Sequence, residues 1–302
     1  MKKSIICAAA AIVALSSCSK TQFVYTNSPE EIGFKAVNGA MTKVVQTTGA
    51  FSQDMGVIAY QGGKTDVYFT NADFNNVSTT WECDEEKYWP IDSSLDFFVY
   101  SPYQATNVTP DPSAKTLTVV VPNNGTNQWD YLYSNAYITG KDKNSGNIPV
   151  DFDHALAYVT VNFSGEDVIT LSDAKLNGTY QSGTYTVTYG TPTTVAWSAQ
   201  GNATDLNLSA GALTADYSTS WMVVPESTGN TITFDYTIAG MTGDAISKEI
   251  TLSESWKAGT HYTYNVTIGA NEIEFEVHSV TGWDEDLDDD PETDDTIDKQ
   301  IN

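Results

Sequence analysis

The sequence predicts an all-β fold. Apolar and polar residues alternate at period two through many short segments, as they do in strands with one buried and one solvent-facing side. Glycine, asparagine and proline gather between these segments, which is typical of the turns that connect strands. Only Gln128–Ala136 is a candidate for a short helix. Many short strands at this spacing indicate β-sandwiches or an open barrel.

The alternating segments define the expected strands. In 231–238 four apolar residues alternate with threonine and aspartate, and 262–268 repeats the pattern. A three-residue link joins 262–268 to the next alternating segment, 272–280, which predicts a hairpin. The sequence is also compatible with a hairpin over 175–189 that turns at Gln181-Ser182-Gly183. The other expected strands are 31–37, 55–60, 66–70, 95–100, 116–121, 155–163, 184–189 and 220–224.

The amino terminus has the features of a secretory signal peptide. Two lysines precede an apolar run over 5–15, and Leu15-Ser16-Ser17-Cys18 follows it. The run is too short to cross the hydrocarbon core of a bilayer. A leucine three positions before the cysteine resembles the bacterial lipoprotein box, in which the cysteine is lipidated and becomes the new amino terminus. We therefore expect a signal peptide over 1–17 and a lipid-anchored linker over 18–23, with the acyl chains on Cys18.

The chain is strongly acidic. It carries 39 aspartates and glutamates against 14 basic residues, all of them lysine, for a formal net charge of −25. Such a surface repels phosphate backbones and has no basic patch for anionic lipid headgroups, so we expect no nucleic-acid partner and membrane attachment only through lipid. Cys83 is the one cysteine beyond Cys18, and its acidic neighbours disfavour the thiolate. We expect an inert or packed thiol there.

The mature chain is long enough for two ordinary domains. The polar stretch 140–147 is the favoured joint, which predicts β-sandwiches over 24–145 and 146–283. Residues 284–302 differ in kind, because they contain ten acidic residues, one lysine and Pro291 but no aromatic side chain. We expect a disordered acidic tail, since such a segment cannot bury enough apolar surface to fold alone.

The sequence contains no recognisable catalytic or metal-binding motif. The three histidines, His154, His261 and His278, lack zinc-motif spacing, and there is no nucleophile elbow, phosphate loop or dinucleotide fingerprint. The acidic triplets within 284–290 lack the glycine and the terminal glutamate of a calcium loop. We therefore expect no enzyme activity, no metal and no cofactor, and we expect His154 to be a hydrogen-bonded structural residue.

Four local patterns, taken together, extend over nearly the whole mature chain. They are Tyr88-Trp89-Pro90 followed by 95–102, Gln128-Trp129-Asp130-Tyr131 within 128–136, Val150-Asp151-Phe152-Asp153-His154 within 150–161, and Trp256-Lys257-Ala258-Gly259 within 256–264 followed by a strand and Trp283. In this order behind a lipoprotein box, they resemble the fimbrillin family, the pilin-like lipoproteins of Bacteroides-type bacteria, and among them the Mfa-like fimbrillins.

The resemblance implies a fold, a location and a way of assembling. The fold would be two tandem transthyretin-like sandwiches, and the protein would be a fimbrial subunit or adhesin, lipid-anchored in the outer membrane at the cell surface. Its partners would be other fimbrial subunits and ligands on host or bacterial surfaces. Assembly would proceed by donor-strand insertion, in which proteolysis removes the first strand and a strand of another subunit takes its place.

The strand that would be removed is Glu31, Ile32, Gly33, Phe34, Lys35, Ala36 and Val37. Related stalk pilins are cut at arginine, which this chain lacks. In the polar loop 38–50, Lys43 is the basic residue at which a cut would fall.

We expect a terminal, tip-like or a solitary position in the fimbrium. A stalk subunit also has to donate a strand, and beyond Trp283 only the acidic tail remains. Aspartate and proline are poor in strands, and packing carboxylates into an apolar groove would cost on the order of several kcal/mol each. An alternative from another class is an outer-membrane glycan-binding lipoprotein of a carbohydrate-uptake system, to which 17 tyrosines and 7 tryptophans would also be suited.

Overall fold

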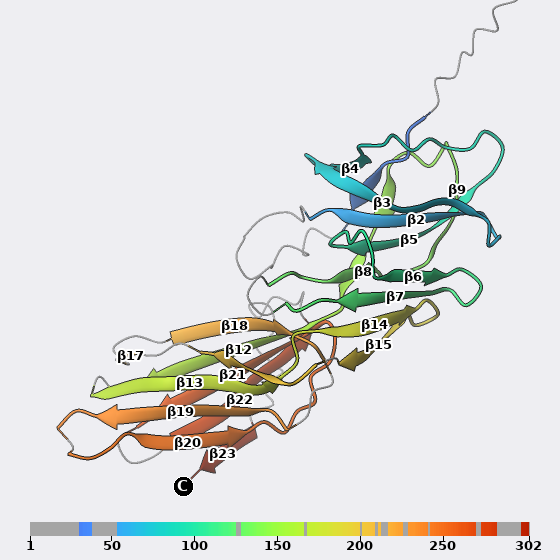
Figure 1. The fold of residues 1–302 in the computed structure, drawn as a ribbon. Helices are drawn as coiled ribbons and strands as arrows, with labels where there is room; N and C mark the ends of the chain where they lie inside the picture. Colours follow the sequence, from blue (N-terminus) through green and yellow to red (C-terminus); the bar gives the residue numbers. More distant parts are fainter. Residues whose placement is uncertain are drawn as a thin grey trace, which may run out of the picture.

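The computed structural model describes residues 30–37, 53–124, 128–165, 168–199, 201–208, 211–212, 217–225, 229–240, 242–269, 273–282 and 297–301. Within these residues the regular secondary structure consists of β-strands alone, which confirms the all-β prediction (Figure 1). The described part of the chain contains no helix with the length and apolar character needed to cross a membrane.

Nine strands from the first half of the chain form one sheet. They are β1 (Phe34–Ala36), β2 (Met55–Gln61), β3 (Val67–Val77), β4 (Thr80–Cys83), β5 (Leu95–Ser101), β8 (Leu132–Ser134), β9 (Ile138–Lys141), β10 (Ile148–Val150) and β11 (Phe152–His154). Their order is β10-β1-β4-β3-β2-β5-β8-β11, with β9 also paired to β5. β1 runs parallel to β10 and antiparallel to β4, so it lies inside the sheet rather than at an edge.

A four-stranded sheet lies in the middle of the molecule (Figure 1). It consists of β6 (Val108–Asp111), β7 (Thr116–Val121), β14 (Gly183–Thr188) and β15 (Thr194–Ala199), in the order β15-β14-β7-β6. β14 pairs with β7 along its whole length, from Gly183 opposite Val121 to Thr188 opposite Thr116. This sheet therefore joins two segments that lie far apart in the sequence.

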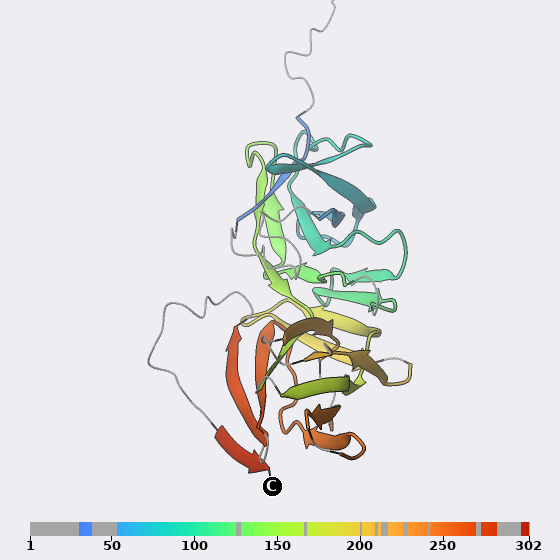
Figure 2. The same cartoon turned by 90° about the vertical axis from the view of Figure 1, so that its left-hand side faces the viewer.

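The remaining described strands form two five-stranded sheets, seen at the lower end in Figures 1 and 2. The first has the order β18-β12-β21-β22-β23, and the second is β16-β13-β19-β20 with β17 beside β13. The bounds are β12 (Ala157–Gly165), β13 (Ile169–Thr179), β16 (Thr204–Asn207), β17 (Gly211–Ala212), β18 (Tyr217–Val223), β19 (Thr231–Ile238), β20 (Ile246–Thr251), β21 (Thr260–Ile268), β22 (Ile273–Gly282) and β23 (Ile297–Ile301).

Three apolar cores hold the sheets together. One core fills the space between the two five-stranded sheets and includes Val161, Phe234 and Tyr264, as the alternation along β12, β19 and β21 requires. A second core lies within the nine-stranded sheet and a third lies between that sheet and the four-stranded one. β2 and β5 are buried on both faces because they contribute alternate residues to the second and third cores.

The expected strands form, but one expected hairpin and the expected short helix do not. The hairpin of 262–268 with 272–280 is confirmed, since β21 and β22 pair antiparallel. The hairpin over 175–189 is wrong, because β13 pairs with β19 while β14 pairs with β7 and β15 in another sheet. The short helix over 128–136 is also wrong, because its middle is β8, which pairs with β5 and β11.

The strand pairing does not follow the predicted boundary at 145/146. β10 and β11 lie after that boundary in the sequence but pair with β1 and β8, and the β14–β15 hairpin extends the sheet of β6 and β7. A division of the chain at that point would separate strands that hydrogen-bond to each other. The number of domains stays a prediction.

Part of the acidic tail forms a strand. β23 pairs antiparallel with β22, with Ile301 opposite Ile273 and Ile297 opposite Val277. For these five residues the prediction of a disordered tail is wrong. The local sequence, Ile-Asp-Lys-Gln-Ile, explains the difference, because it is the part of the tail in which apolar residues recur and acidic ones thin out.

Candidate functional site

The segment 30–37, which contains the predicted removable strand, is hydrogen-bonded on both sides. On one side the Ile32 N–H donates to the Lys87 carbonyl at 2.7 Å, and the Trp89 N–H donates to the Glu30 carbonyl at 2.9 Å. On the other side the Ile148 N–H donates to the Gly33 carbonyl at 2.8 Å, and the Val37 N–H donates to the Val150 carbonyl at 2.9 Å. The segment therefore fills a slot between β4, with the 87–89 stretch beyond it, and β10.

The side chains of this segment alternate between the core and solvent. Ile32 and Phe34 are buried, whereas Glu31 and Lys35 are exposed. The Phe34 ring is fully buried and meets the rings of Phe74 and Phe97 edge to face, at centroid distances of 5.1 and 5.5 Å. The segment thus contributes two apolar side chains, two residues apart, to the second core.

The proposed anchor and cut site lie outside the described residues. Cys18 and Lys43 both belong to the parts of the chain that the structure does not describe, and so does Trp283. Their predicted roles stay predictions. The described residues 37 and 53 flank the segment that contains Lys43.

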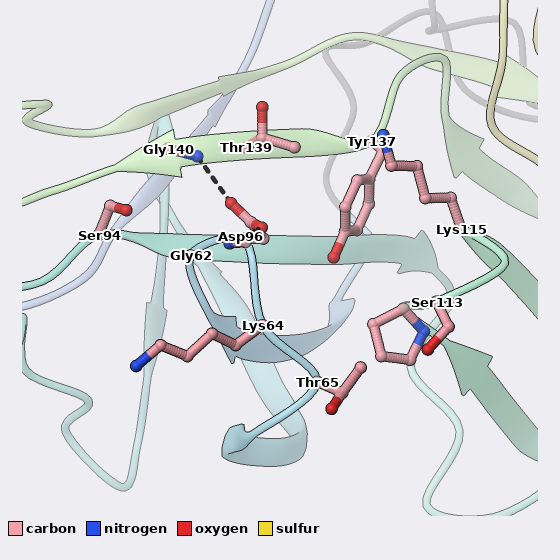
Figure 3. Close-up of a pocket in the computed structure, with 12 residues that line it drawn as sticks. Gly62, Lys64, Thr65, Ser94, Asp96, Ser113, Lys115, Tyr137, Thr139 and Gly140 are labelled. Carbon is pink, nitrogen blue, oxygen red and sulfur yellow. Dashed lines mark hydrogen bonds between the residues drawn. The ribbon is translucent and has the colours of Figure 1, made fainter.

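A pocket of about 440 Å³ opens between β5, β9 and the turns that follow β2 and β6 (Figure 3). Asp96 lies at its floor, is 5 % exposed, and accepts hydrogen bonds from the Gly63 N–H at 2.8 Å and the Gly140 N–H at 2.7 Å. The two carboxylate oxygens therefore link the turn after β2 to β9, and we interpret Asp96 as a structural residue. Sequence reasoning missed this role, because no local pattern marks a carboxylate that pairs with two distant glycines.

Tyr137 forms another wall of this pocket (Figure 3). Burial, and then the charge of Asp96, raises the pKa of Tyr137 to about 12, so its hydroxyl is a neutral donor at physiological pH. The Lys115 ammonium lies 5.9 Å from the centroid of the Tyr137 ring, within the range of a cation–π contact. The Asp96 carboxylate and the Lys115 ammonium at this pocket are therefore already engaged by other groups of the protein.

His154 has the structural role that the sequence predicts. It is 3 % exposed, and its Nδ1 lies 3.0 and 2.9 Å from the two carboxylate oxygens of the fully buried Asp130. Asp130 belongs to the second of the four sequence patterns and His154 to the third, so the pair joins the stretch before β8 to β11. A buried pair of this kind holds the two stretches of chain in a fixed position relative to each other.

Cys83 is a half-buried free thiol in β4. Burial, together with the nearby charges of Glu85 and Asp73, raises its pKa, although a backbone hydrogen bond and Lys87 act in the opposite direction. This agrees with the prediction of an unactivated thiol. Within the described residues, no three histidine, cysteine, aspartate or glutamate side chains come together in a metal-binding group.

The structure also separates exposed aromatic residues from buried ones, which the sequence could not do. Trp81, Trp89, Trp197 and Trp256 are buried, whereas Trp129 is 51 % exposed. Tyr68 is also exposed, at 38 %. Trp129 borders a second pocket, described below.

Comparison with known proteins identifies the family. Residues 42–283 match the model of the fimbrillin-like family, which covers well over half of the chain. No curated protein matches the chain. Among solved structures, a candidate cell adhesion protein from Bacteroides uniformis aligns at 20 % identity over 84 % of this chain and 99 % of its own, with a TM-score of 0.57.

Two further solved structures share the fold. A fimbrial protein from Bacteroides vulgatus aligns at 20 % identity and a TM-score of 0.54, over 84 % of this chain and 99 % of its own. A candidate cell adhesion protein from Bacteroides ovatus aligns at 14 % identity and a TM-score of 0.57, over 85 % of this chain and 99 % of its own. The structural matches extend the agreement in fold over most of the chain, and the family match shows that the chain belongs to the fimbrillin-like family.

Proposed function

We propose that this protein reaches the outer cell surface as a lipid-anchored fimbrial subunit or adhesin, and that it accepts a strand from another subunit after proteolysis has removed its own segment 30–37 together with the lipid-bearing Cys18. The observation that carries the proposal is the place of β1, which is only three residues long, lies inside the nine-stranded sheet and supplies the fully buried Phe34. Family membership supports the fimbrial role.

Removal of segment 30–37 would leave a slot shaped for another strand. The Ile148 N–H and the carbonyls of Lys87 and Val150 would lose their partners, and the space of the Ile32 and Phe34 side chains would be left empty. Unpaired backbone groups beside an apolar hollow favour an incoming extended segment, because its backbone restores the hydrogen bonds and its alternate apolar side chains fill the hollow. The register of such a segment follows from the two-residue spacing of these side chains.

The cut would fall at Lys43. Between Val37 and Gln53 it is the one basic residue in the sequence, so a protease that requires a basic residue has a single target there. A cut at this point separates segment 30–37, with the lipid-bearing Cys18, from β2 and all that follows. The cut form would then keep the segment only through the contacts described above.

We also propose a terminal, tip-like or solitary position. The pairing of β23 with β22 weakens one reason for it, since the tail does contain a strand-forming segment. The pairing also supplies another reason, because a strand that is paired within its own chain is not free to complete the sheet of a neighbour.

Deletion of residues 284–302 tests this position. If the tail is not a donor strand, the deletion should leave folding and surface display unchanged. If the full protein polymerises and the deletion variant does not, the tail is instead a donor strand.

Strand replacement can be tested with peptides. The purified protein is cut within 38–50 and the amino-terminal fragment is removed, and a labelled peptide of residues 30–37 is then added to this cut form and to the uncut form. We expect the peptide to bind the cut form and to raise its melting temperature, because it restores the lost hydrogen bonds and side chains. A matched peptide with alanine in place of Ile32 and Phe34 should not bind. Equal binding of both peptides, or binding to the uncut form, would show that removal of segment 30–37 does not open a strand-accepting slot.

The role of Lys43 itself is tested in cells. In the variant Lys43→Ala the surface protein should stay uncut, whereas Lys43→Arg keeps a basic residue and should be cut as before. Mass spectrometry of the surface protein distinguishes the two outcomes. Cutting of the alanine variant at the same place would show that another residue directs the protease.

A second candidate function, glycan binding, has one observation in its favour. Trp129 is half exposed beside an open pocket, and a tryptophan ring in that position suits a sugar. Glycan binding and strand replacement use different parts of the molecule, so an adhesin can combine them.

A further inference from the structure

A pocket of about 520 Å³ lies among three loops of the first half of the chain. One wall is Gln53 and Asp54, before β2. The second is the stretch Pro102 to Gln104, after β5, and the third includes Pro122, Trp129 and Tyr131. A volume in this range accommodates one or two sugar rings. Apart from Tyr131, which belongs to the third core, its lining residues lie outside the apolar cores, and none belongs to segment 30–37.

Each wall is fixed from behind by a buried side chain. The Trp81 indole N–H donates to the Gln53 carbonyl at 2.8 Å, and the Ser101 hydroxyl donates to the Asp54 carbonyl at 2.9 Å. Trp81 is 3 % exposed and Ser101 is fully buried. Because a buried donor holds each carbonyl, the first wall does not have to be ordered when a ligand arrives.

The second wall is held by the buried Tyr100. Its hydroxyl lies 3.1 Å from the Gln104 carbonyl and 3.2 Å from the Gln104 N–H, and the Asn71 amide donates to the same carbonyl at 2.6 Å. Tyr100 is fully buried. The stretch that includes Pro102 and Tyr103 is therefore tied at its far end to β3 and at its near end to β5.

The third wall presents Trp129 on a rigid support. Asn124 is 3 % exposed, and its side-chain amide donates to the Trp129 carbonyl and accepts from the Trp129 N–H, both at 2.9 Å. The Gln128 amide donates in turn to the Asn124 carbonyl at 2.7 Å. The backbone of Trp129 is thus clamped while 51 % of the residue faces solvent. An exposed ring on a clamped backbone contributes contact area with little loss of conformational entropy on binding.

The chemistry of the lining selects a class of ligand. Trp129, Tyr103 and two prolines offer flat apolar faces, while Asp54 and the two glutamines offer a carboxylate and amides. Ligands with apolar faces and hydroxyl edges, such as pyranose sugars, match both kinds of surface.

The charge of the pocket lining restricts the class of ligand further. Asp54 is the charged residue in the lining, and no lysine accompanies it. The chain as a whole carries a net charge of −25, so the surrounding field repels anions. Sialylated or uronic-acid glycans are therefore disfavoured, whereas the hydroxyls of a neutral sugar can donate hydrogen bonds to the carboxylate.

We propose that the pocket formed by Gln53, Asp54, Tyr103, Gln104 and Trp129 binds a neutral saccharide, with a sugar ring stacked on Trp129 and its hydroxyls bound by Asp54 and the glutamine amides. The site goes beyond fimbrial assembly, since it requires neither the cut at Lys43 nor an incoming strand. The pocket of Figure 3 is a poorer candidate, because its buried carboxylate is already occupied by two backbone amides.

The test is a binding measurement on the purified mature chain. An array of neutral and acidic oligosaccharides identifies the strongest neutral binder, and calorimetric titration of that oligosaccharide then gives its affinity for the variants. We expect Trp129→Ala to weaken binding by roughly tenfold or more and Trp129→Phe to weaken it less, since phenylalanine keeps a smaller aromatic face. Asp54→Asn should weaken it too, because a neutral amide is a poorer acceptor than a carboxylate.

Tyr68→Ala is the matched control. Tyr68 is an exposed aromatic residue outside the pocket, at 38 % exposure, so its replacement should leave the affinity unchanged. Melting temperatures show whether each variant is folded, and the phenylalanine and asparagine variants serve if the alanine variant is not. The proposal is overturned if no neutral oligosaccharide binds at about 1 mM, if acidic glycans are preferred, or if the Trp129 variants bind as the unaltered protein does. Loss of subunit association rather than sugar binding in these variants would make the pocket a protein interface and would likewise overturn it.

Discussion

Replacement of Phe34 by alanine tests the packing of β1 on the sheet. The Phe34 side chain is fully buried, contacts the rings of Phe74 and Phe97 edge to face, and belongs to a strand that is hydrogen-bonded on both sides. A phenylalanine-to-alanine change in a core costs about 3–5 kcal/mol, which includes the lost transfer free energy and the cavity that is left. Because β1 is short and the sheet around it can partly collapse, we expect the lower part of that range, about 3–4 kcal/mol.

The assay is urea or thermal unfolding followed by tryptophan fluorescence. Trp81 and Trp89 are buried in the same core as Phe34, so their emission reports on this sheet. A loss of about 3–4 kcal/mol should lower the melting temperature by roughly 6–16 °C for a domain of this size. Val37→Ala is the control within the same segment. Val37 is 58 % exposed, and its replacement should change the unfolding free energy by no more than about 0.5 kcal/mol.

A loss below about 1 kcal/mol for Phe34→Ala would refute the reasoning. It would mean that segment 30–37 does not contribute to the core. Its removal would then open no apolar slot, and strand replacement at this place would lose its physical basis.

Three further outcomes are expected. Cys18→Ala should abolish acyl labelling and release the uncut protein from membranes, whereas unchanged pelleting of the uncut protein with membranes would exclude lipid anchoring at this residue. Burial raises the pKa of Tyr100, Tyr131 and Tyr137 to about 12 in the folded protein, against 10.0 ordinarily. The unfolded chain therefore loses these protons first, so the contribution of these tyrosines to stability should be constant below about pH 9 and fall between pH 10 and 12; a flat profile in urea titrations between pH 10 and 12 would contradict it. Asp130→Ala removes the carboxylate that pairs with the buried His154 and should lower the unfolding free energy by about 1–3 kcal/mol, measured by denaturant titration, with a change near zero as the contrary result.

The sequence predicted the strands well because alternation is a local property. In 231–238 and 262–268 the apolar face is visible residue by residue, and β19 and β21 form there. The short link after 268 in the sequence also predicts the partner of β21, because two alternating segments joined by so few residues favour a hairpin with each other. His154 was likewise predictable, since a lone histidine among apolar residues requires a buried partner.

Pairing between distant strands was not predictable from local pattern. Alternation shows that β13 and β14 each have a buried face, but it does not show that β14 leaves its neighbour and pairs with β7. For the same reason the sequence did not show that strands on either side of 145/146 pair with each other. β23 was missed because the average charge of 284–302 conceals the five residues in which isoleucines recur.

Of the two candidate sites, the sequence indicated one and gave no sign of the other. The segment that we predict to be removed was visible in the sequence as the first alternating stretch, and the structure adds that it lies inside the sheet. The pocket at Trp129 could not be predicted, because seven tryptophans look alike in the sequence. Only tertiary contacts show that, among the tryptophans that the structure describes, four are buried while Trp129 is half exposed.

The most direct test of strand replacement is the amino-terminal sequence of the protein taken from the cell surface. If the chain matures as we propose, the sequence should begin within the 38–50 loop, next to Lys43, and segment 30–37 should be missing from the assembled protein. A surface protein that begins at a lipidated Cys18 and keeps the residues 30–37 would contradict the account, because no slot for a partner strand would then open.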